Sequence, residues 1–107
     1  MKKALSKETV LQILRKELPR LREQYGVERI AVYGSFADGS PTTQSDVDLL
    51  VQLMKPLGLE FIRLTYDLEE LLGRKVDLAT FDTLNRSMKN PRYKHIASDI
   101  QRTLAYV

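Results

Sequence analysis

The sequence predicts a small α/β (α+β) domain, and three observations lead to that fold class. Residues 6–25 repeat apolar side chains at intervals of three and four, the period of an amphipathic helix. A second helical stretch covers residues 59–72. Three short segments alternate apolar and other residues as strands do, and they are residues 28–33, 45–53 and 75–81. A chain of 107 residues is near the commonest domain size, so we expect a single domain over residues 1–107.

Composition excludes several classes of protein. The net charge of +3 and the pI near 9.3 permit contact with nucleotides, nucleic acid or an acidic partner, without selecting among them. The chain has no cysteine, which excludes a disulfide framework and a thiolate site. No apolar segment follows the N-terminal lysines as in a signal peptide, and no run reaches the roughly 18 apolar residues needed to span a membrane. We therefore expect a cytoplasmic protein.

The helix predicted over residues 6–25 has recognisable ends. Ser6 can cap its first turn, and Gly26 follows it as glycine often follows a helix. Pro19 falls inside the run and is expected to kink the helix or to split it in two. The apolar stripe consists of Val10, Leu11, Leu14, Leu18 and Leu21. The expected solvated charges of this helix are Arg15, Lys16, Arg20 and Arg22.

The strand predicted over residues 28–33 runs directly into a turn of small residues, Gly34-Ser35. A glycine beside a small hydroxyl residue lets backbone N–H groups approach an anion closely, and a following helix start would favour negative charge. We therefore predict that Gly34 and Ser35 bind phosphate. Ser35 is not predicted to be a nucleophile, because the chain has one histidine and the surroundings differ from a G-x-S-x-G elbow.

Two carboxylates, Asp46 and Asp48, open the strand predicted over residues 45–53. Side chains two apart in a strand share a face, with roughly 6–7 Å between their α-carbons. Like charges this close repel each other, and a magnesium ion between them would remove the repulsion. A lone D-x-D pair is more often only a solvated face, but the preceding Gly-Ser turn favours a site for phosphate and metal.

The helix predicted over residues 59–72 ends at Gly73. Asp67, Glu69 and Glu70 are expected on its solvated face. The side chains expected on its buried side are Leu59, Phe61, Ile62, Leu64, Tyr66, Leu68, Leu71 and Leu72.

Asp77 is an isolated acid among the apolar residues of the strand predicted over residues 75–81. Such a carboxylate is costly to bury unless it is paired, hydrogen-bonded or bound to metal. Asp77 is therefore a candidate for pairing, hydrogen bonding or metal binding, and the family resemblance described below places it with Asp46 and Asp48.

In the last part of the chain, the sequence predicts two helices on either side of a break at residues 90–91. The first covers residues 83–89, and the second runs from about residue 92 toward residue 105. Asp82 is expected to cap a turn or the first helix. His95, the one histidine, is expected to be exposed or to face a partner rather than to act in catalysis.

The pattern Gly34-Ser35, ten residues, then Asp46-x-Asp48 resembles the GSx10DxD signature of nucleotidyltransferases with the DNA-polymerase-β-like fold. The short chain resembles the minimal nucleotidyltransferase (MNT) group, whose members act as antitoxins beside HEPN-domain ribonuclease toxins. The resemblance extends from the first helix through the third strand, and the motif is specific because both spacing and residue identity must hold. One position departs, since many relatives carry a basic residue where this chain has Asp38.

This resemblance implies a polymerase-β-like core, in which helices flank a small mixed sheet. It implies two Mg²⁺ ions, with ATP as the substrate and Asp77 orienting the attacking hydroxyl or taking its proton. The implied reaction transfers AMP to a tyrosine hydroxyl of a HEPN toxin and neutralises it within a hetero-oligomer, without direct contact to nucleic acid or membrane. The implied metal ligands are Asp46, Asp48 and Asp77, and the implied phosphate-binding residues are Gly34, Ser35 and Ser45.

Two alternatives stay open. The chain could be an antitoxin that neutralises its partner by binding alone, or a nucleotide-sensing module that binds a triphosphate without turnover. The presence of all three acids argues against a decayed site, whereas the acid at position 38 leaves room for one.

Overall fold

The computed structural model describes residues 5–38 and 46–107. At its centre is a sheet of four strands, which are β1 (Val27–Tyr33), β2 (Val47–Leu53), β3 (Val76–Thr80) and β4 (Ala105–Tyr106). The strand order is β3-β2-β1-β4. β2 pairs parallel with β3 and antiparallel with β1, and β4 pairs antiparallel with β1. The mixed sheet expected for this chain is therefore confirmed.

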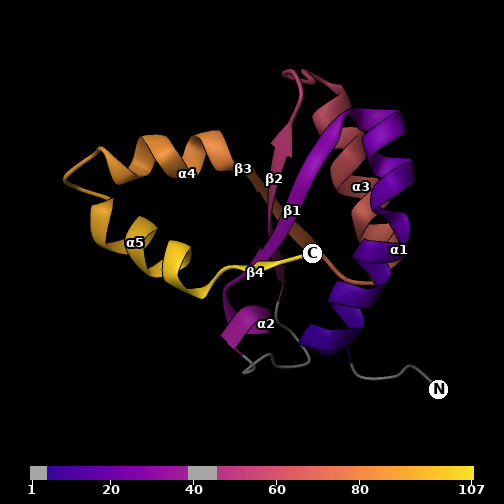
Figure 1. The fold of residues 1–107 in the computed structure, drawn as a ribbon, viewed down its shortest axis with the longest axis horizontal. Coiled ribbons are helices and arrows are strands. Elements are labelled where there is room, and N and C mark those ends of the chain that lie inside the picture. Colours follow the sequence, from indigo (N-terminus) through magenta and orange to yellow (C-terminus); the bar gives the residue numbers. More distant parts are fainter. Residues whose placement is uncertain (1–4, 39–45) are drawn as a thin grey trace.

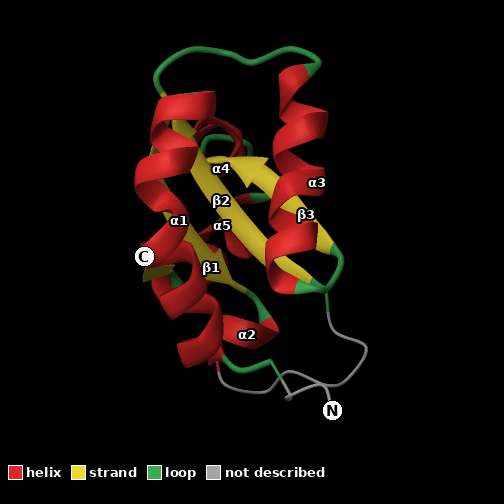
Figure 2. Cartoon of the chain, turned by 90° about the vertical axis from the view of Figure 1, so that its right-hand side faces the viewer, coloured by secondary structure: helices red, strands yellow, loops and turns green. Residues whose placement is uncertain are grey.

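Helices cover both faces of the sheet (Figure 1). α1 (Lys7–Tyr25) and α3 (Glu60–Leu72) pack on one face and stand in front of the strands in Figure 2. α4 (Phe81–Met88) and α5 (Lys94–Thr103) form a helical hairpin on the other face. The short α2 (Ser35–Asp38) follows the end of β1. No helix in the described ranges is long and apolar enough to cross a membrane.

Both faces of the sheet bury apolar side chains, because successive strand residues point to opposite sides. The larger core, under α1 and α3, contains Ile30 and Val32 of β1 and Leu49 of β2. The smaller core, under α4 and α5, contains the alternate residues Ala31 and Leu50. The faces predicted from the sequence alternation are therefore confirmed in these strands.

α1 is one continuous helix of 19 residues, so a split at Pro19 is wrong. Leu14 and Leu21, on either side of the proline, are fully buried, and this packing stabilises the helix through the proline. The predicted ends are confirmed. The Ser6 hydroxyl accepts the N–H three residues later at 3.2 Å, and Gly26 ends the helix with a left-handed φ of 72°.

Arg20 and Asp67 join α1 to α3, so the prediction that both are solvated is wrong. The Arg20 guanidinium donates to both carboxylate oxygens of Asp67 at 2.9 Å, and the Tyr25 hydroxyl donates to the same carboxylate at 3.0 Å. The hydrogen bond from Arg20 above all holds the pKa of Asp67 below its ordinary value. Glu69 is engaged as well, because its carboxylate accepts the N–H of Val76 at 3.0 Å.

Only one stripe of α3 is buried. Its fully or nearly fully buried residues recur every fourth position and are Leu64, Leu68 and Leu72. The prediction was wrong for three other apolar residues, whose exposed fractions are 83% for Leu59, 52% for Ile62 and 66% for Tyr66. A helix lying on a sheet turns only one stripe inward, and these three residues lie on its outer side.

The C-terminal part differs from its prediction at both ends. Thr80 caps α4, since its hydroxyl accepts the N–H of Thr83 at 3.1 Å, and the predicted cap Asp82 lies inside the first turn instead. α5 ends before Ala105, because the chain there joins the sheet as β4 and pairs Ala105 with Val32 of β1.

Candidate active site

The glycine–serine turn and one of the predicted acids meet at one end of the sheet. β1 ends at Tyr33, Gly34 adopts a left-handed φ of 71°, and α2 begins at Ser35. The Gly34 carbonyl accepts the N–H of Ala37 at 3.1 Å. A Cβ atom on Gly34 would overlap Oδ2 of Asp48 and lie 3.1 Å from its Cγ. Glycine is required here both for the backbone conformation and for the space that the carboxylate fills.

Asp48 and Asp77 lie side by side on adjacent strands. They are direct partners in the parallel pairing of β2 with β3, where strands are about 4.8 Å apart and partners share a face. On its other side Asp48 pairs with Tyr33 of β1. The structure therefore brings one phenol and two carboxylates into a row across three strands.

Asp46 stands just outside this row, and its predicted place within the strand is wrong. β2 begins at Val47, whose N–H donates to the Lys75 carbonyl at 2.9 Å, and Asp46 precedes it with an exposed side chain. The ladder begins there because β3 itself begins at Val76, the partner of Val47. Asp46 is still close enough to Asp48 to influence its titration.

The carboxylates repel one another. Burial, then the charge of Asp77 and then that of Asp46, raises the pKa of Asp48 above its ordinary value. Burial, followed by the charges of Asp77 and Asp48, raises the pKa of Tyr33 to about 12, so its phenol stays protonated at neutral pH. Within residues 5–38 and 46–107, none of the three acids accepts a hydrogen bond or pairs with a cation. A bound cation would therefore stabilise this end of the sheet.

The donor set fits magnesium in its chemistry, since carboxylate oxygens are ligands that Mg²⁺ prefers. Asp48 and Asp77 would supply ligands from the sheet, and Asp46 from the residue before β2. In the part of the chain that the structure describes, however, no three His, Cys, Asp or Glu side chains are already grouped closely enough to hold a metal ion.

Arg74 is a candidate site residue that the sequence interpretation missed. Its guanidinium lies 5.5 Å from the ring centroid of Phe36, the buried residue after Ser35 in α2. The strand topology, unlike the local sequence, indicates that this residue lies near the site. Because β2 and β3 run parallel, the residues before β3 lie at the same end of the sheet as Asp46. Without that pairing, Arg74 and Lys75 look like ordinary charges in a loop.

Two predicted features lie outside the described residues. Ser45, the third predicted phosphate ligand, belongs to residues 39–45, as does the loop that connects the turn to the acids. The side chain of Asp38 is also outside the description. Their roles stay predictions.

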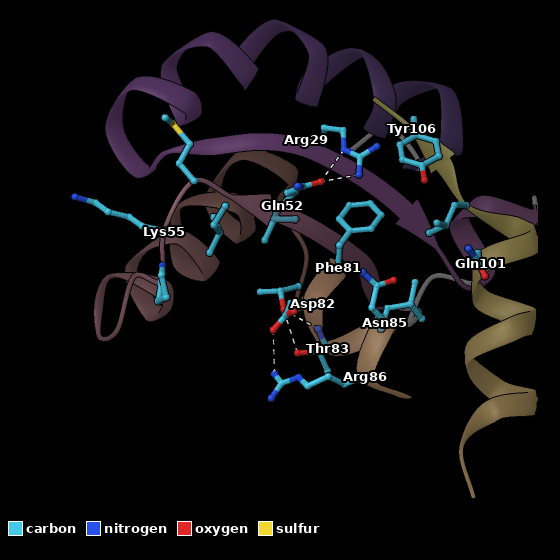
Figure 3. A pocket seen from close by; sticks show the side chains of 17 residues that line it. Arg29, Gln52, Lys55, Phe81, Asp82, Thr83, Asn85, Arg86, Gln101 and Tyr106 are labelled. Carbon is cyan, nitrogen blue, oxygen red and sulfur yellow. Dashed lines mark hydrogen bonds and ion pairs between the residues drawn. The ribbon is translucent and has the colours of Figure 1, made fainter. Parts of the chain in front are cut away.

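A large cavity lies elsewhere (Figure 3). It has a volume of about 820 Å³, and the Arg29 guanidinium in it donates to the Gln52 side-chain oxygen at 3.0 and 2.6 Å. The same guanidinium lies 4.9 Å from the ring centroid of Phe81 and 5.5 Å from that of Tyr106. Gln52 follows Asp48 by four residues, about 13 Å along the strand. The acids therefore lie outside this cavity, at the opposite end of β2.

Neighbouring carboxylates beside a glycine–serine turn are typical of enzymes that use bound metal ions to transfer phosphate-linked groups. The chain matches the nucleotidyltransferase domain over residues 11–103, and it belongs to that family. The family predicted from the motif spacing is confirmed.

The similar proteins include curated sequences that match nearly end to end. The protein adenylyltransferase MntA of Thermococcus cleftensis is 38% identical over 104 residues, which cover 96% of this chain and 97% of that protein. A protein of Methanocaldococcus jannaschii, named as a candidate protein adenylyltransferase, is 37% identical over 101 residues, with 92% and 94% covered.

Solved structures show the same fold. A candidate minimal nucleotidyltransferase superposes with a TM-score of 0.70 at 30% identity, over 97% of this chain and 98% of that one. A toxin–antitoxin structure with AMP-PNP superposes with a TM-score of 0.60 at 18% identity, over 95% of this chain and 72% of that one. The second likeness concerns the fold alone.

Proposed function

We propose that this chain is a Mg²⁺-dependent protein adenylyltransferase that acts as an antitoxin. It transfers AMP from ATP to a tyrosine hydroxyl of a HEPN ribonuclease toxin and so neutralises the toxin. The observation that carries the proposal is Asp48, which lies against Gly34 and pairs with Asp77, because two carboxylates are thereby placed beside the turn that would bind a nucleotide phosphate. The names of the relatives, which include protein adenylyltransferases, support a protein as the acceptor.

The turn after β1 binds the triphosphate in this proposal. The Gly34 N–H, the Ser35 hydroxyl and the start of α2 would contact the β- and γ-phosphates, with Ser45 contributing from the connecting loop. Arg74, beside α2, would supply a cation to the phosphates. That contribution compensates for Asp38, which stands where many relatives carry a basic residue.

The acids serve the transfer itself. Asp46, Asp48 and Asp77 would hold two Mg²⁺ ions, which when bound would neutralise the triphosphate and stabilise charge at the α-phosphorus. Asp77, exposed on the edge strand β3, would orient the acceptor phenol and take its proton as the phenolic oxygen attacks the α-phosphorus. Pyrophosphate then leaves. Tyr33, whose pKa is about 12, keeps its proton and adds no further negative charge to the site.

The acceptor comes from a partner protein, so a hetero-oligomer is part of the proposal. Toxin–antitoxin assemblies of the same fold, one of them with AMP-PNP, support both a toxin partner and an adenine nucleotide. HEPN identity and a tyrosine acceptor follow from the resemblance of the motif to the MNT group.

The test is the intact mass of the product of the neighbouring gene after incubation with this chain, Mg²⁺ and each nucleoside triphosphate in turn. We expect a gain of one AMP group with ATP, and its loss with the Asp46→Ala/Asp48→Ala variant. Glu70→Ala is the matched control, because it removes an exposed carboxylate of α3 outside the site and should leave the transfer intact.

A second function has one observation in its favour. Because Asp46 lies outside the strand and no three acids are grouped for a metal among the described residues, a binding-only antitoxin or a nucleotide sensor also fits this arrangement of residues. Formation of a stable complex with its partner, without any mass gain under any triphosphate, would replace the enzymatic proposal with this one.

A further inference from the structure

The α4–α5 hairpin is an arm that projects from the sheet, and its turn lies at the outer end of the molecule in Figure 1. All eight residues from 89 to 96, around that turn, are exposed. The arm is held against the sheet by Leu84 of α4 and by Ala97 in the first turn of α5, both buried in the smaller core. The Ser98 hydroxyl also donates to the Met88 sulfur at 3.7 Å, which ties the two helices together. One side of the turn faces the sheet, since Tyr93 and Ile96 line a small pocket with Tyr33, and the rest of the turn is open to other molecules.

The arm carries the excess positive charge of the chain. Residues 83–98 contain four Lys or Arg residues, the one His, and no Asp or Glu. Lys89, Arg92 and Lys94, around the turn, form no ion pair with described residues. The candidate active site has the opposite sign, since at that end of the sheet the three acids Asp46, Asp48 and Asp77 outnumber the two cations of residues 74–75. The turn of one copy is therefore complementary in charge to the site of another.

The chain has five tyrosines, and only Tyr93 combines exposure with this positive surrounding. Tyr25 is buried, and Tyr33 is half-buried in the sheet beside its own acids. Tyr106 is 50% exposed, but its ring stacks on Phe81 in the cavity of Figure 3, and the one guanidinium beside it, Arg29, already donates to Gln52. Tyr66 is exposed, but α3 around it carries four acids and one arginine, which an acidic site repels. Tyr93 lies in the turn of the arm, is 45% exposed, and stands between an arginine and a lysine.

We propose that this chain adenylylates itself between copies, with Tyr93 of one copy as the acceptor and the acids of a second copy as the catalyst. The proposal rests on the proposed adenylyltransferase function. The Tyr93 phenolic oxygen forms a bond to the α-phosphorus of ATP, and the bond from that phosphorus to the oxygen bridging to the β-phosphorus breaks. Pyrophosphate leaves, and the phenolic proton passes to Asp77 of the second copy.

Tyr93 lines a small pocket with Tyr33 of its own sheet, where the packing of Ala97 holds it in place, so we assign its approach to a bound triphosphate to a second copy, which the dilution experiment below tests. Once Tyr93 carries AMP, the same copy is not expected to be modified a second time. The phosphodiester adds a negative charge to the turn, which weakens its attraction to an acidic site. Higher salt should slow the modification for the same electrostatic reason.

The experiment mixes two variants of different mass with ATP and Mg²⁺. The donor copy carries Tyr93→Phe with its acids intact, and the acceptor copy carries Asp46→Ala/Asp48→Ala with Tyr93 intact. We expect AMP on the acceptor copy, located at Tyr93 by peptide mass analysis, and none on either variant alone. The label should fall at least tenfold on an acceptor that also carries Tyr93→Phe. It should not change on an acceptor that carries Tyr66→Phe instead.

A parallel reaction separates this inference from the function on which it rests. The donor copy is also incubated with the product of the neighbouring gene. Label on that protein without label on Tyr93, or label on Tyr66 or Tyr106 instead, overturns self-modification and leaves the proposed function standing. Absence of label on both proteins overturns both. A rate constant per chain that does not change on dilution of the wild-type chain rejects the transfer between copies.

Discussion

Replacing Gly34 with alanine should lower both the stability of the fold and the rate of AMP transfer, the latter because the new side chain displaces the carboxylate of Asp48. Two costs add at this position. The left-handed φ of 71° costs a non-glycine residue roughly 1–2 kcal/mol. The new Cβ overlaps Oδ2 of Asp48, and turning that carboxylate off its rotamer costs about 1 kcal/mol more. Because a shift of about 1 Å in a reacting group can cost a factor of roughly 100, transfer should fall by about that factor.

Gly73→Ala is the matched control. Gly73 ends α3 with a φ of 65°, and nothing lies within 4 Å of an added Cβ, so it has the backbone cost without the overlap. Urea unfolding should show Gly34→Ala to be the less stable variant by about 1 kcal/mol, and the excess should disappear in an Asp48→Ala background. AMP transfer at wild-type rate by a folded Gly34→Ala chain would refute the reasoning, as would an equal loss of activity in Gly73→Ala.

Three further predictions concern other contacts. Leu64→Ala should cost about 2–5 kcal/mol in urea unfolding, whereas Ile62→Ala, on the exposed side of the same helix, should change stability by about 0.5 kcal/mol or less; equal losses would contradict the observed burial. Asp67→Asn should cost about 1 kcal/mol at pH 7 after solvent screening. The pKa of Asp67 is lower in the folded than in the unfolded chain. The stability difference between wild type and Asp67→Asn is therefore fully present above the unfolded pKa of about 3.9 and is lost as the pH falls through the folded pKa. A stability difference that stays constant down to about pH 2 would contradict this role of Asp67. Arg74→Ala should weaken binding of a non-hydrolysable ATP analogue with Mg²⁺ about tenfold by calorimetry, close to 1.4 kcal/mol, and Lys75→Ala should not.

The sequence predicts most of the sheet because alternation is a local signal. The side-chain direction at Ala31 or Leu50 depends only on its place in a strand, and tertiary packing on both faces then follows that alternation. The exposure of Ile62 has no local signal, since apolar residues on two sides of a helix look alike until a partner surface is known. β4 could not be predicted either, because two residues are too few to show a period.

In the candidate site, too, some residues could be predicted from the sequence and others could not. The spacing from Gly34 to Asp48 indicates that turn and acid meet, and the structure shows the glycine lying against that carboxylate. Asp77 could be identified because it matches the third acid of the polymerase-β-like pattern, whereas the burial expected for it is wrong, since its side chain is exposed on the edge strand. Arg74 could not, because its place beside α2 depends on the parallel pairing of β2 with β3.

The packing of β2 fixes the catalytic geometry from a distance. Leu49 is buried on one face of the sheet and Leu50 on the other, so both faces of the strand are occupied. A slip of one residue would turn Asp48 into the larger core and Leu49 toward the acids, at the cost of a buried charge. The strand therefore has one register, and that register sets Asp48 beside Asp77 and against Gly34. Burial and the repulsion from neighbouring carboxylates, which together raise the pKa of Asp48, are thus tolerated by a strand whose register is fixed, and two carboxylates stay together before any nucleotide or cation binds.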